Sequence, residues 1–393
     1  MRRSWVRIPE LAPSSKAAAR TGRGFFRPRR IVSREKTSKR CGCQSPPDAA
    51  PLPCGPVVDD DARRVLIVIE STIGGTRLNL RIVTEELVAC GKSVAIAYAA
   101  RREKAFMDDV AIFRSMGVEC VEIPMRRAPS PVSDLRAIFS LRRLAGRFRP
   151  DVLHLISSKA GLVGRVAAIG LGVRVQYAPH CFAFKSDSPL RHFYALAERL
   201  LVPLTDTLVA VCGSEADDAR RIGYTDDRIK VVPNHLPAAY APRRRASPHG
   251  GRTAVAFIGR NARQKGVDIL LAAYGMLGGT ARRGFDLHVM SDLSPDMRKA
   301  FEGLGAVVHP YGSHDDAMAL LSRCDVLAMP SRWEASPYLV LEALAAGLFV
   351  VAHDVGGIGE MIGDGGQGLL YEGDGPDALA EALAGLTNGA VLP

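Results

Sequence analysis

The chain has 393 residues, of which 47% are hydrophobic and 24% are charged. So apolar a composition offsets the entropy of ordering the chain, which excludes disorder throughout, and the length favours two domains over one. No run of about 18 uncharged apolar residues occurs, so we expect no membrane-spanning helix.

The net charge of +11 is concentrated at the N-terminus. Residues 1–58 contain thirteen Lys and Arg but three acidic residues, whereas the other 335 residues contain 39 basic and 38 acidic ones. The body of the chain is therefore electrically balanced, and we expect no nucleic-acid partner.

We interpret residues 1–62 as a disordered basic leader. The first 58 residues are rich in Arg, Ser and Pro and lack hydrophobic periodicity, which fits a disordered arm, an organelle transit peptide, or translated sequence upstream of a misassigned start. We favour the last interpretation, and we expect no secretory signal because no apolar core follows the first arginines. The rest of the chain holds five single cysteines, a pattern that favours a reducing cytoplasm.

From residue 65 onward, short apolar runs alternate with helical segments. The runs are continuously hydrophobic rather than alternating, which is typical of parallel strands covered on both faces. The first series of expected strands is 65–70, 93–99, 118–124, 152–156, 173–178 and 207–212. The second series is 254–259, 285–290, 306–310, 325–330 and 348–352.

A polar Pro/Gly/Arg stretch separates the two series. The sequence therefore predicts an α/β protein with two doubly wound, Rossmann-like domains at 63–240 and 253–393, joined by a linker at 241–252. Ligands of such sheets bind at the carboxyl ends of the strands, so we expect the functional site in a cleft between the domains.

The segment 330–347 carries the strongest functional signal. We expect Ser336 to cap a helix that has Pro337 at its first position and that stops at Gly347. The first-turn amides of a helix have no partner within it, so this helix start would bind an anionic group.

Four residues of that segment are candidates for ligand contacts. The amides around Tyr338 and Leu339 would meet the anion, while Glu334 and Glu342 would flank it and bind sugar or ribose hydroxyls. The alternative is a pair of solvated glutamates, because this spacing also arises by chance.

A second segment, 257–274, places two cations after a buried strand. Arg260 and Lys265 precede a helix expected to begin near Gly266, and together they would clamp a diphosphate. Ordinary surface charge is the alternative.

Two further features follow strands of the first series. Gly74 and Gly75 form a turn that lets a ligand approach the backbone at a helix start. The turn is not a GxGxxG motif, which argues against a dinucleotide dehydrogenase. His180 follows the strand at 173–178 and so faces the expected cleft, either in a catalytic or binding role or as a satisfied structural histidine.

The basic amphipathic stretch 135–149 has two interpretations: a helix with a solvated basic face, or a helix that rests on anionic lipid. The acidic runs at 59–61 and 315–316 lack further ligands at workable spacing, so we expect no metal site.

Taken together, these segments resemble a family 4 glycosyltransferase of the GT-B fold over residues 65–386. The segment with Glu334 and Glu342, which has the pattern Glu-x7-Glu, is part of the resemblance. The motif SSKAGLVGR, with its Ser-Lys pair, is similar to the corresponding sequence of family members that build bacterial polysaccharide and capsule on lipid carriers. The other motifs that carry it are GGT at 74–76, PDVLHLISSKAGLVGRVAA at 150–168, APHCFAF at 178–184, TDTLVAVCGSEADDA at 205–219, VVPN at 231–234, GRNARQKG at 259–266, GGIGEMI at 356–362 and GLLYEGDGPDALAEAL at 368–383.

The resemblance implies a role for each candidate residue. Arg260 and Lys265 would hold the diphosphate of a nucleotide sugar, Glu342 the ribose hydroxyls and Glu334 the transferred sugar. The amides near Tyr338 and Leu339 would help to hold the donor. Gly75 and His180 would face the reacting centre from the first domain.

The implied activity is a retaining, metal-independent transfer of a sugar from a nucleotide-diphosphate sugar to a sugar or lipid-linked acceptor, of hexosyltransferase type and without a cofactor. Such a protein would be cytoplasmic, with peripheral contact at the inner face of the cell membrane as a further expectation. The stretch 288–296 and residues 335–337 depart from the sequence that is usual in the family at these positions. The helical segment that relatives carry after residue 386 is missing, so we expect a shortened C-terminus. A nucleotide-sugar epimerase of the same fold and an inactive truncated remnant are the alternatives.

Overall fold

The computed structural model describes residues 57–58, 61–99, 106–244, 251–363 and 366–387. The expected leader lies outside the described residues except at its end, where Val58 and Ala62 are buried in the core beside the first sheet. The expectation of a shortened C-terminus also lies outside the described residues, which end at residue 387.

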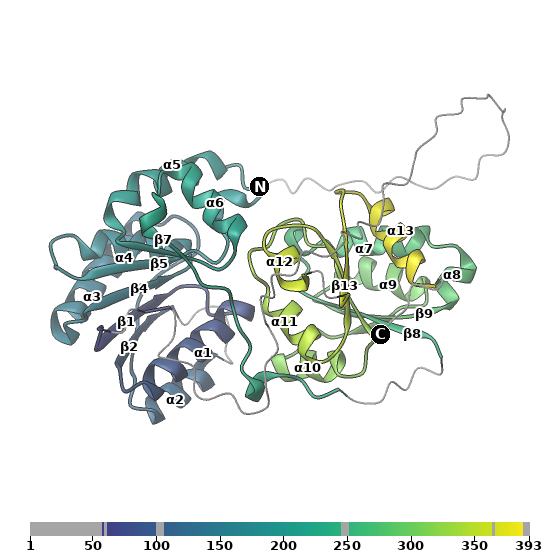
Figure 1. Cartoon of the computed structure of the whole chain (residues 1–393), viewed down its shortest axis with the longest axis horizontal. Helices are drawn as coiled ribbons and strands as arrows, with labels where there is room; N and C mark the ends of the chain where they lie inside the picture. The colour runs from purple at the N-terminus through teal and green to yellow at the C-terminus, as the bar shows by residue number, and fades with distance from the viewer. Residues whose placement is uncertain (1–56, 59–60, 100–105, 245–250, 364–365, 388–393) are drawn as a thin grey trace, which may run out of the picture. The chain divides into compact units, whose positions relative to one another are not determined.

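The first sheet has seven parallel strands in the order β3-β2-β1-β4-β5-β6-β7 (Figure 1). These strands are β1 (Arg64–Ile69), β2 (Ser93–Tyr98), β3 (Glu119–Glu122), β4 (Val152–Ile156), β5 (Arg174–Ala178), β6 (Thr207–Ala210) and β7 (Ile229–Val231). The helices between them are α1 (Gly74–Ala89), α2 (Phe106–Ser115), α3 (Pro131–Phe148), α4 (Ser158–Ala168), α5 (Arg191–Leu201) and α6 (Gly213–Ile222).

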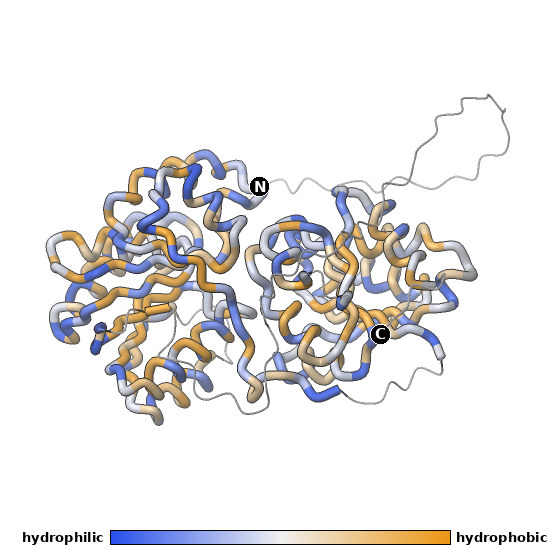
Figure 2. The backbone as a smooth tube through the Cα atoms, viewed as in Figure 1, coloured by the Kyte–Doolittle hydropathy of each residue, from blue (hydrophilic) through white to orange (hydrophobic). Residues whose placement is uncertain are grey.

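Both faces of the first sheet are covered by helices, as alternate residues of β1 illustrate. Leu66 and Val68 pack on the side of α3, α4 and α6, whereas Val65, Ile67 and Ile69 pack on the side of α1 and α2. Burial on both faces explains why the strands are hydrophobic at nearly every position, which Figure 2 shows as orange strands.

The second sheet has six parallel strands in the order β10-β9-β8-β11-β12-β13. These strands are β8 (Thr253–Ile258), β9 (Phe285–Met290), β10 (Val307–His309), β11 (Val326–Met329), β12 (Phe349–His353) and β13 (Gly368–Tyr371). The helices are α7 (Val267–Met276), α8 (Gly279–Arg283), α9 (Pro295–Gly303), α10 (His314–Leu321), α11 (Tyr338–Ala345), α12 (Ile358–Ile362) and α13 (Pro376–Thr387).

The second sheet is also covered on both faces. Val255 and Phe257 of β8 pack on the side of α7, α9 and α13, while Ala254, Ala256 and Ile258 pack on the side of α10, α11 and α12. The α/β prediction with two doubly wound parallel sheets is therefore confirmed.

Helix α4 lies unusually close to the first sheet because it carries two glycines. A Cβ on Gly161 would lie 2.4 Å from Cε2 of Tyr177, and one on Gly164 would lie 2.2 Å from Cδ2 of Leu155. The stretch AGLVGR thus encodes a tight helix–sheet contact, which brings the next side chain, Arg165, into the protein interior.

Arg165 is fully buried and is the centre of a polar network. Its Nη2 donates to Oε2 of Glu198 on α5 at 2.7 Å, its Nε donates to the Gly161 carbonyl at 2.8 Å, and its guanidinium lies 4.2 Å from the centre of the Tyr177 ring. The Tyr177 hydroxyl donates to the other Glu198 oxygen at 2.8 Å. This network ties α4, α5 and β5 together.

Two strands were not expected from the sequence. β7 has three residues, and β13 has four that begin with glycine, so neither gives a hydrophobic run long enough to stand out. No helix within the described ranges is both long and apolar enough to cross a bilayer.

Candidate functional site

The carboxyl ends of β8 and β11 carry two loops that are bonded to each other. Nε2 of Gln264 donates to the Trp333 carbonyl at 3.0 Å, and the Arg332 amide donates to the Gln264 carbonyl at 2.8 Å. Gly266 sits between the loops with a φ of 67°, and a Cβ there would lie 1.9 Å from the Pro330 carbonyl oxygen. Only glycine tolerates both this positive φ and this close approach, so the contact between the two loops depends on Gly266.

The junction brings two expected site residues together. Nζ of Lys265 lies 2.5 Å from Oε1 of Glu334, and the two side chains are 22% and 8% exposed. Arg260 lies two residues after the end of β8, is half-buried, and has no hydrogen bond or ion pair through its guanidinium to any described residue. Of the two expected cations, Lys265 is therefore paired, and the Arg260 guanidinium has no partner among the residues that the structure describes.

Helix α11 begins one residue later than expected. Pro337, in an extended conformation, is the N-cap, and the helix starts at Tyr338. Ser336 does not cap it, because its buried hydroxyl points to Sδ of Met361 at 3.6 Å. The end of the helix is as expected, since Gly347 follows it with a φ of 74°.

The helix start still presents free backbone donors. The amides of Tyr338 and Leu339 have no acceptor within α11, because the first donor to reach back is Val340, which bonds the Pro337 carbonyl at 3.0 Å. These two amides and the N-terminal dipole of α11 favour a negatively charged ligand group.

Gly75 lies against this helix start. A Cβ on Gly75 would be 3.4 Å from Cδ2 of Tyr338 and 3.9 Å from its amide nitrogen. The buried Tyr338 hydroxyl accepts a hydrogen bond from Nδ2 of Asn79 at 3.0 Å, and burial raises the pKa of this phenol. Asn234, in turn, donates to the Ser336 carbonyl at 2.7 Å. Asn234 thus holds the loop before α11, and Asn79 holds the first side chain of the helix.

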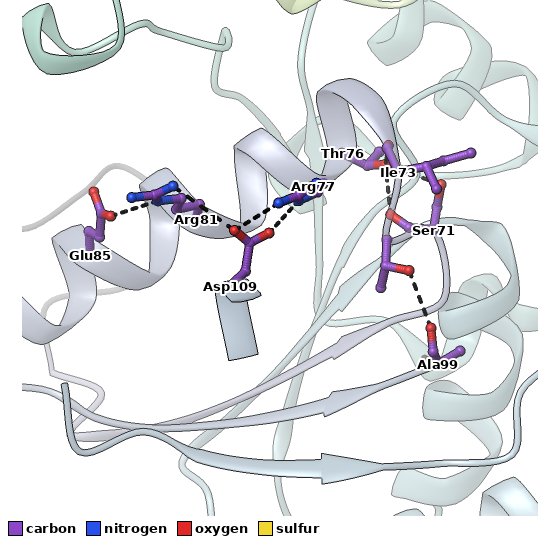
Figure 3. A network of polar contacts seen from close by, with 9 residues as sticks. Ser71, Ile73, Thr76, Arg77, Arg81, Glu85, Ala99 and Asp109 are labelled. Carbon is purple, nitrogen blue, oxygen red and sulfur yellow. Dashed lines mark hydrogen bonds and ion pairs between the residues drawn. The ribbon is translucent and has the colours of Figure 1, made fainter. Parts of the chain in front are cut away.

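Polar contacts at the start of α1 fix the turn that carries Gly75 (Figure 3). The Thr76 hydroxyl lies 2.7 Å from the Ser71 carbonyl and 2.9 Å from the Ile73 carbonyl. The next residue, Arg77, pairs with the buried Asp109 of α2. These contacts give the two-glycine turn a defined geometry.

Glu342 lies on α11 and is almost fully buried. Its Oε1 accepts a hydrogen bond from Nε2 of His314, the first residue of α10, at 2.7 Å. This bond raises the pKa of His314, with burial opposing and the charges of Glu342 and Asp315 reinforcing the shift.

His180 lies just after β5 in a strained part of the chain. His180 and Cys181 have φ values of 49° and 79°, and Ser157, after the neighbouring strand β4, has a φ of 86°. Burial lowers the pKa of His180 to about 4, so its imidazole is neutral at pH 7. Strained non-glycine residues of this kind concentrate at functional sites.

A buried carboxylate supports this strained segment. Glu215 accepts the Cys181 amide at 2.6 Å and the Val211 amide at 2.9 Å. Burial raises the pKa of Glu215 to about 7, against the lowering effect of these two hydrogen bonds.

Several of these residues were not identified from the sequence. Asn79, Asn234, Glu215 and His314 each contact an expected site residue or its neighbour. Their partners lie from 28 to 259 residues away in the chain, so no local pattern joins them. Two of them had a signal, since Asn234 ends the VVPN stretch and Glu215 lies in the stretch TDTLVAVCGSEADDA.

The chain matches two family models. Residues 74–235 match the model described as "Glycosyl transferase 4-like domain", and residues 252–388 match "Glycosyl transferases group 1".

Several curated proteins are similar in sequence. The α-maltose-1-phosphate synthase of Mycolicibacterium smegmatis is 30% identical over 278 residues, which cover 61% of this chain and 69% of that protein. A UDP-Gal:α-D-GlcNAc-diphosphoundecaprenol α-1,3-galactosyltransferase of Escherichia coli is 25% identical over 67% of this chain and 73% of its own length. A 41.2 kDa protein of the cps region of Klebsiella pneumoniae is 28% identical over 59% of this chain and 68% of its own.

Solved structures share the fold. Sucrose-phosphate synthase from Thermosynechococcus elongatus has a TM-score of 0.67 at 15% identity, covering 84% of this chain and 91% of that one. The Anabaena protein HepE, in complex with UDP and glucose, has a TM-score of 0.65 at 19% identity, with coverages of 84% and 92%. A UDP-N-acetylglucosamine 2-epimerase homologue from Listeria monocytogenes has a TM-score of 0.56 at 11% identity, with coverages of 84% and 89%. These likenesses confirm the expected GT-B fold.

Proposed function

Because the chain belongs to the glycosyltransferases that combine a 4-like domain with a group 1 domain, we propose that it is a retaining, metal-independent transferase whose donor is a nucleotide-diphosphate sugar. The observation that carries this proposal is the set of groups that the second domain places after the carboxyl ends of the adjacent strands β8 and β11. These groups are Arg260, the Lys265–Glu334 pair, the amides at the start of α11 and the buried Glu342 on that helix.

Each part of that arrangement suits one part of the donor. Arg260 and the amides of Tyr338 and Leu339 would bind the diphosphate, and Lys265 would join them by exchanging Glu334 for a phosphate oxygen. Glu334 would then be free to accept hydrogen bonds from the transferred sugar. Glu342 would accept them from the ribose hydroxyls.

We propose that configuration is retained by a front-face exchange at the anomeric carbon. The bond from this carbon to the diphosphate oxygen breaks, and a bond to the acceptor oxygen forms on the same face of the sugar. The acceptor proton passes to a phosphate oxygen of the departing nucleoside diphosphate. Cations and helix amides fixed in place before the reaction stabilise the negative charge that develops on the leaving group, which is the task a metal ion performs in other enzymes.

The first half would supply the acceptor side of the site. His180 is neutral at pH 7 because its pKa is lowered to about 4, so it can hydrogen-bond a sugar hydroxyl without adding charge. The Escherichia coli relative acts on a diphosphoundecaprenol-linked sugar by its name, and the Klebsiella pneumoniae relative belongs to a cps region. We therefore propose a sugar or lipid-linked acceptor and a role in cell-surface polysaccharide or glycolipid synthesis.

Helix α3 supports a peripheral contact with an anionic membrane at the inner face of the cell membrane. Val132, Leu135 and Phe139 form one stripe and are 63%, 56% and 68% exposed, and Arg136 and Arg143 are exposed beside them. Sedimentation with phosphatidylglycerol vesicles should be lost in Phe139→Ser. Equal sedimentation of this variant would contradict the contact.

The direct test of the proposed activity uses purified protein, the sugar conjugates of UDP, GDP and ADP, and short glycan or undecaprenyl-linked acceptors. Release of nucleoside diphosphate together with a product of the donor's own anomeric configuration, unchanged by EDTA, is expected. An inverted product or dependence on a divalent cation would reject those parts of the proposal.

The same experiment separates the alternatives. An epimerase of this fold would convert the sugar without forming a glycoside, and an inactive remnant would bind no nucleotide and form no product. Arg260→Ala should abolish donor binding, with Arg298→Ala, a half-buried arginine of α9, as the matched control. Unchanged turnover in Arg260→Ala would refute the diphosphate assignment.

A further inference from the structure

From the contact between α10 and α11, we infer that His314 is a positioning residue that orients the Glu342 carboxylate toward the ribose of the donor. This inference rests on the proposed function, because it assumes that a nucleotide occupies the site. It concerns a residue outside the sequence motifs that identify the family.

The carboxylate of Glu342 depends on this histidine. Glu342 is 3% exposed, and within the described part of the chain His314 is the one side chain that hydrogen-bonds its carboxylate. Burying a carboxylate without partners costs several kcal/mol, so the bond decides which way the group turns. A carboxylate only accepts hydrogen bonds, so Nε2 of His314 carries the proton.

The backbone around His314 is itself fixed. Ser313 caps α10, with its hydroxyl accepting the Asp316 amide at 3.2 Å and its own amide donating to the Asp316 carboxylate at 2.8 Å. This capping box sets the direction in which the first helical side chain leaves the backbone. Because α10 and α11 pack on the same face of the second sheet, the imidazole reaches Glu342 from a rigid base.

The bond leaves room for a ligand. Nε2 occupies one lone pair of Oε1, so the second oxygen and one further lone pair stay free for two ribose hydroxyls. The His314 side chain is 43% exposed, so the pair can be reached from solvent.

The charge of His314 adds a pH dependence. Its hydrogen bond to Glu342 raises the pKa of the imidazole, the negative charges of Glu342 and Asp315 act in the same direction, and burial and the positive charge of Arg77 on α1 oppose them. The imidazolium therefore persists to higher pH than in a free histidine. As pH rises through the raised pKa, the charge-assisted bond weakens and so should nucleotide binding.

The test compares two ligands and three variants by titration calorimetry. The ligands are the ribonucleoside diphosphate that wild type binds among UDP, GDP and ADP, and its 2′,3′-dideoxy counterpart. The variants are His314→Ala, His314→Gln, and the control His192→Gln, whose exposed histidine on α5 contacts its neighbour Arg191.

His314→Ala should weaken the ribonucleotide by roughly tenfold and leave the dideoxynucleotide unchanged, so that the preference for ribose collapses. His314→Gln, whose amide can donate but cannot titrate, should keep most of the preference and lose the extra fall in affinity that wild type shows as pH rises through the raised pKa of His314. Titration of the phosphates is common to all proteins and cancels in the comparison.

The outcomes distinguish the two proposals. No binding of any nucleotide by wild type would overturn the proposed donor and this inference with it. Binding by wild type, with equal losses for both ligands in His314→Ala or with no loss for either, would overturn the inference alone and leave the donor assignment standing.

Discussion

Replacement of Glu198 by glutamine should strongly destabilise the first half of the protein. Glu198 and Arg165 form an ion pair whose side chains are 6% and 0% exposed, with Oε2 and Nη2 2.7 Å apart. Glutamine keeps the shape of the side chain and removes its charge, so the Arg165 guanidinium would remain buried without a counter-charge.

The magnitude follows from that burial. Breaking a buried ion pair by removing one partner costs about 3–5 kcal/mol, because the remaining charge is far from water. For a domain of about 180 residues, such as the first domain, this loss lowers the melting temperature by roughly 6–20 °C. Arg165 also lies 4.2 Å from the centre of the Tyr177 ring, so the lost order should extend to β5, the strand that leads to His180.

The assay is urea unfolding followed by far-UV circular dichroism. The matched control is Asp217→Asn, which removes the charge from a surface pair with Arg220 whose side chains are 59% and 47% exposed, and which should change stability by less than about 1 kcal/mol. The double replacement Arg165→Met with Glu198→Leu should recover most of the loss, because no charge is left buried. A cost for Glu198→Gln as small as that of the control would refute the reasoning.

The remaining predictions concern the second half and the response to acid. Lys265→Gln should raise the donor KM by roughly 10–100-fold, whereas Lys299→Gln, at an exposed position on α9, should not, as initial rates will show. Gly266→Ala should destabilise by about 2–4 kcal/mol and abolish nucleotide binding, while Gly278→Ala, with φ −59° and no atom within 4 Å of a new Cβ, should leave both within error in melting and titration experiments. Burial lowers the pKa of His154 from 6.5 to about 3, so stability should fall as pH drops from about 6.5 toward 3, and His154→Gln should make that fall shallower in urea titrations across this range.

The sequence predicted the fold well because the signals for it are local. The strand β4 (Val152–Ile156) has the expected bounds, and the starts of β8 and α11 each differ from expectation by one residue. Continuous apolar runs and helix-stopping glycines act over a few residues, so they survive without knowledge of the tertiary structure.

The misses have a common cause. β7 and β13 are edge strands with few residues, whose pairing with β6 and β12 is decided by neighbours distant in sequence. Ser336 was expected to cap α11, but packing against Met361 turned its hydroxyl away. Tertiary contacts overrode local propensity in each case.

The candidate site divides in the same way. The loop residues Arg260, Lys265 and Glu334 and the helix residue Glu342 could be named because their positions relative to strand ends and helix starts are encoded locally. That Lys265 pairs with Glu334, and Glu342 with His314, could not be foreseen. Side-chain partners across separate elements depend on how those elements pack.

The left-handed backbone at Ser157, His180 and Cys181 has a consequence for anyone who would engineer this enzyme. An L-residue in this region costs about 1–2 kcal/mol that glycine does not. Three glycines would therefore make a sturdier protein, and a search guided by thermal tolerance alone would select them. The same search would remove a hydroxyl, an imidazole and a thiol from the ends of the adjacent strands β4 and β5. Selection for stability and selection for function therefore favour different residues at these three positions.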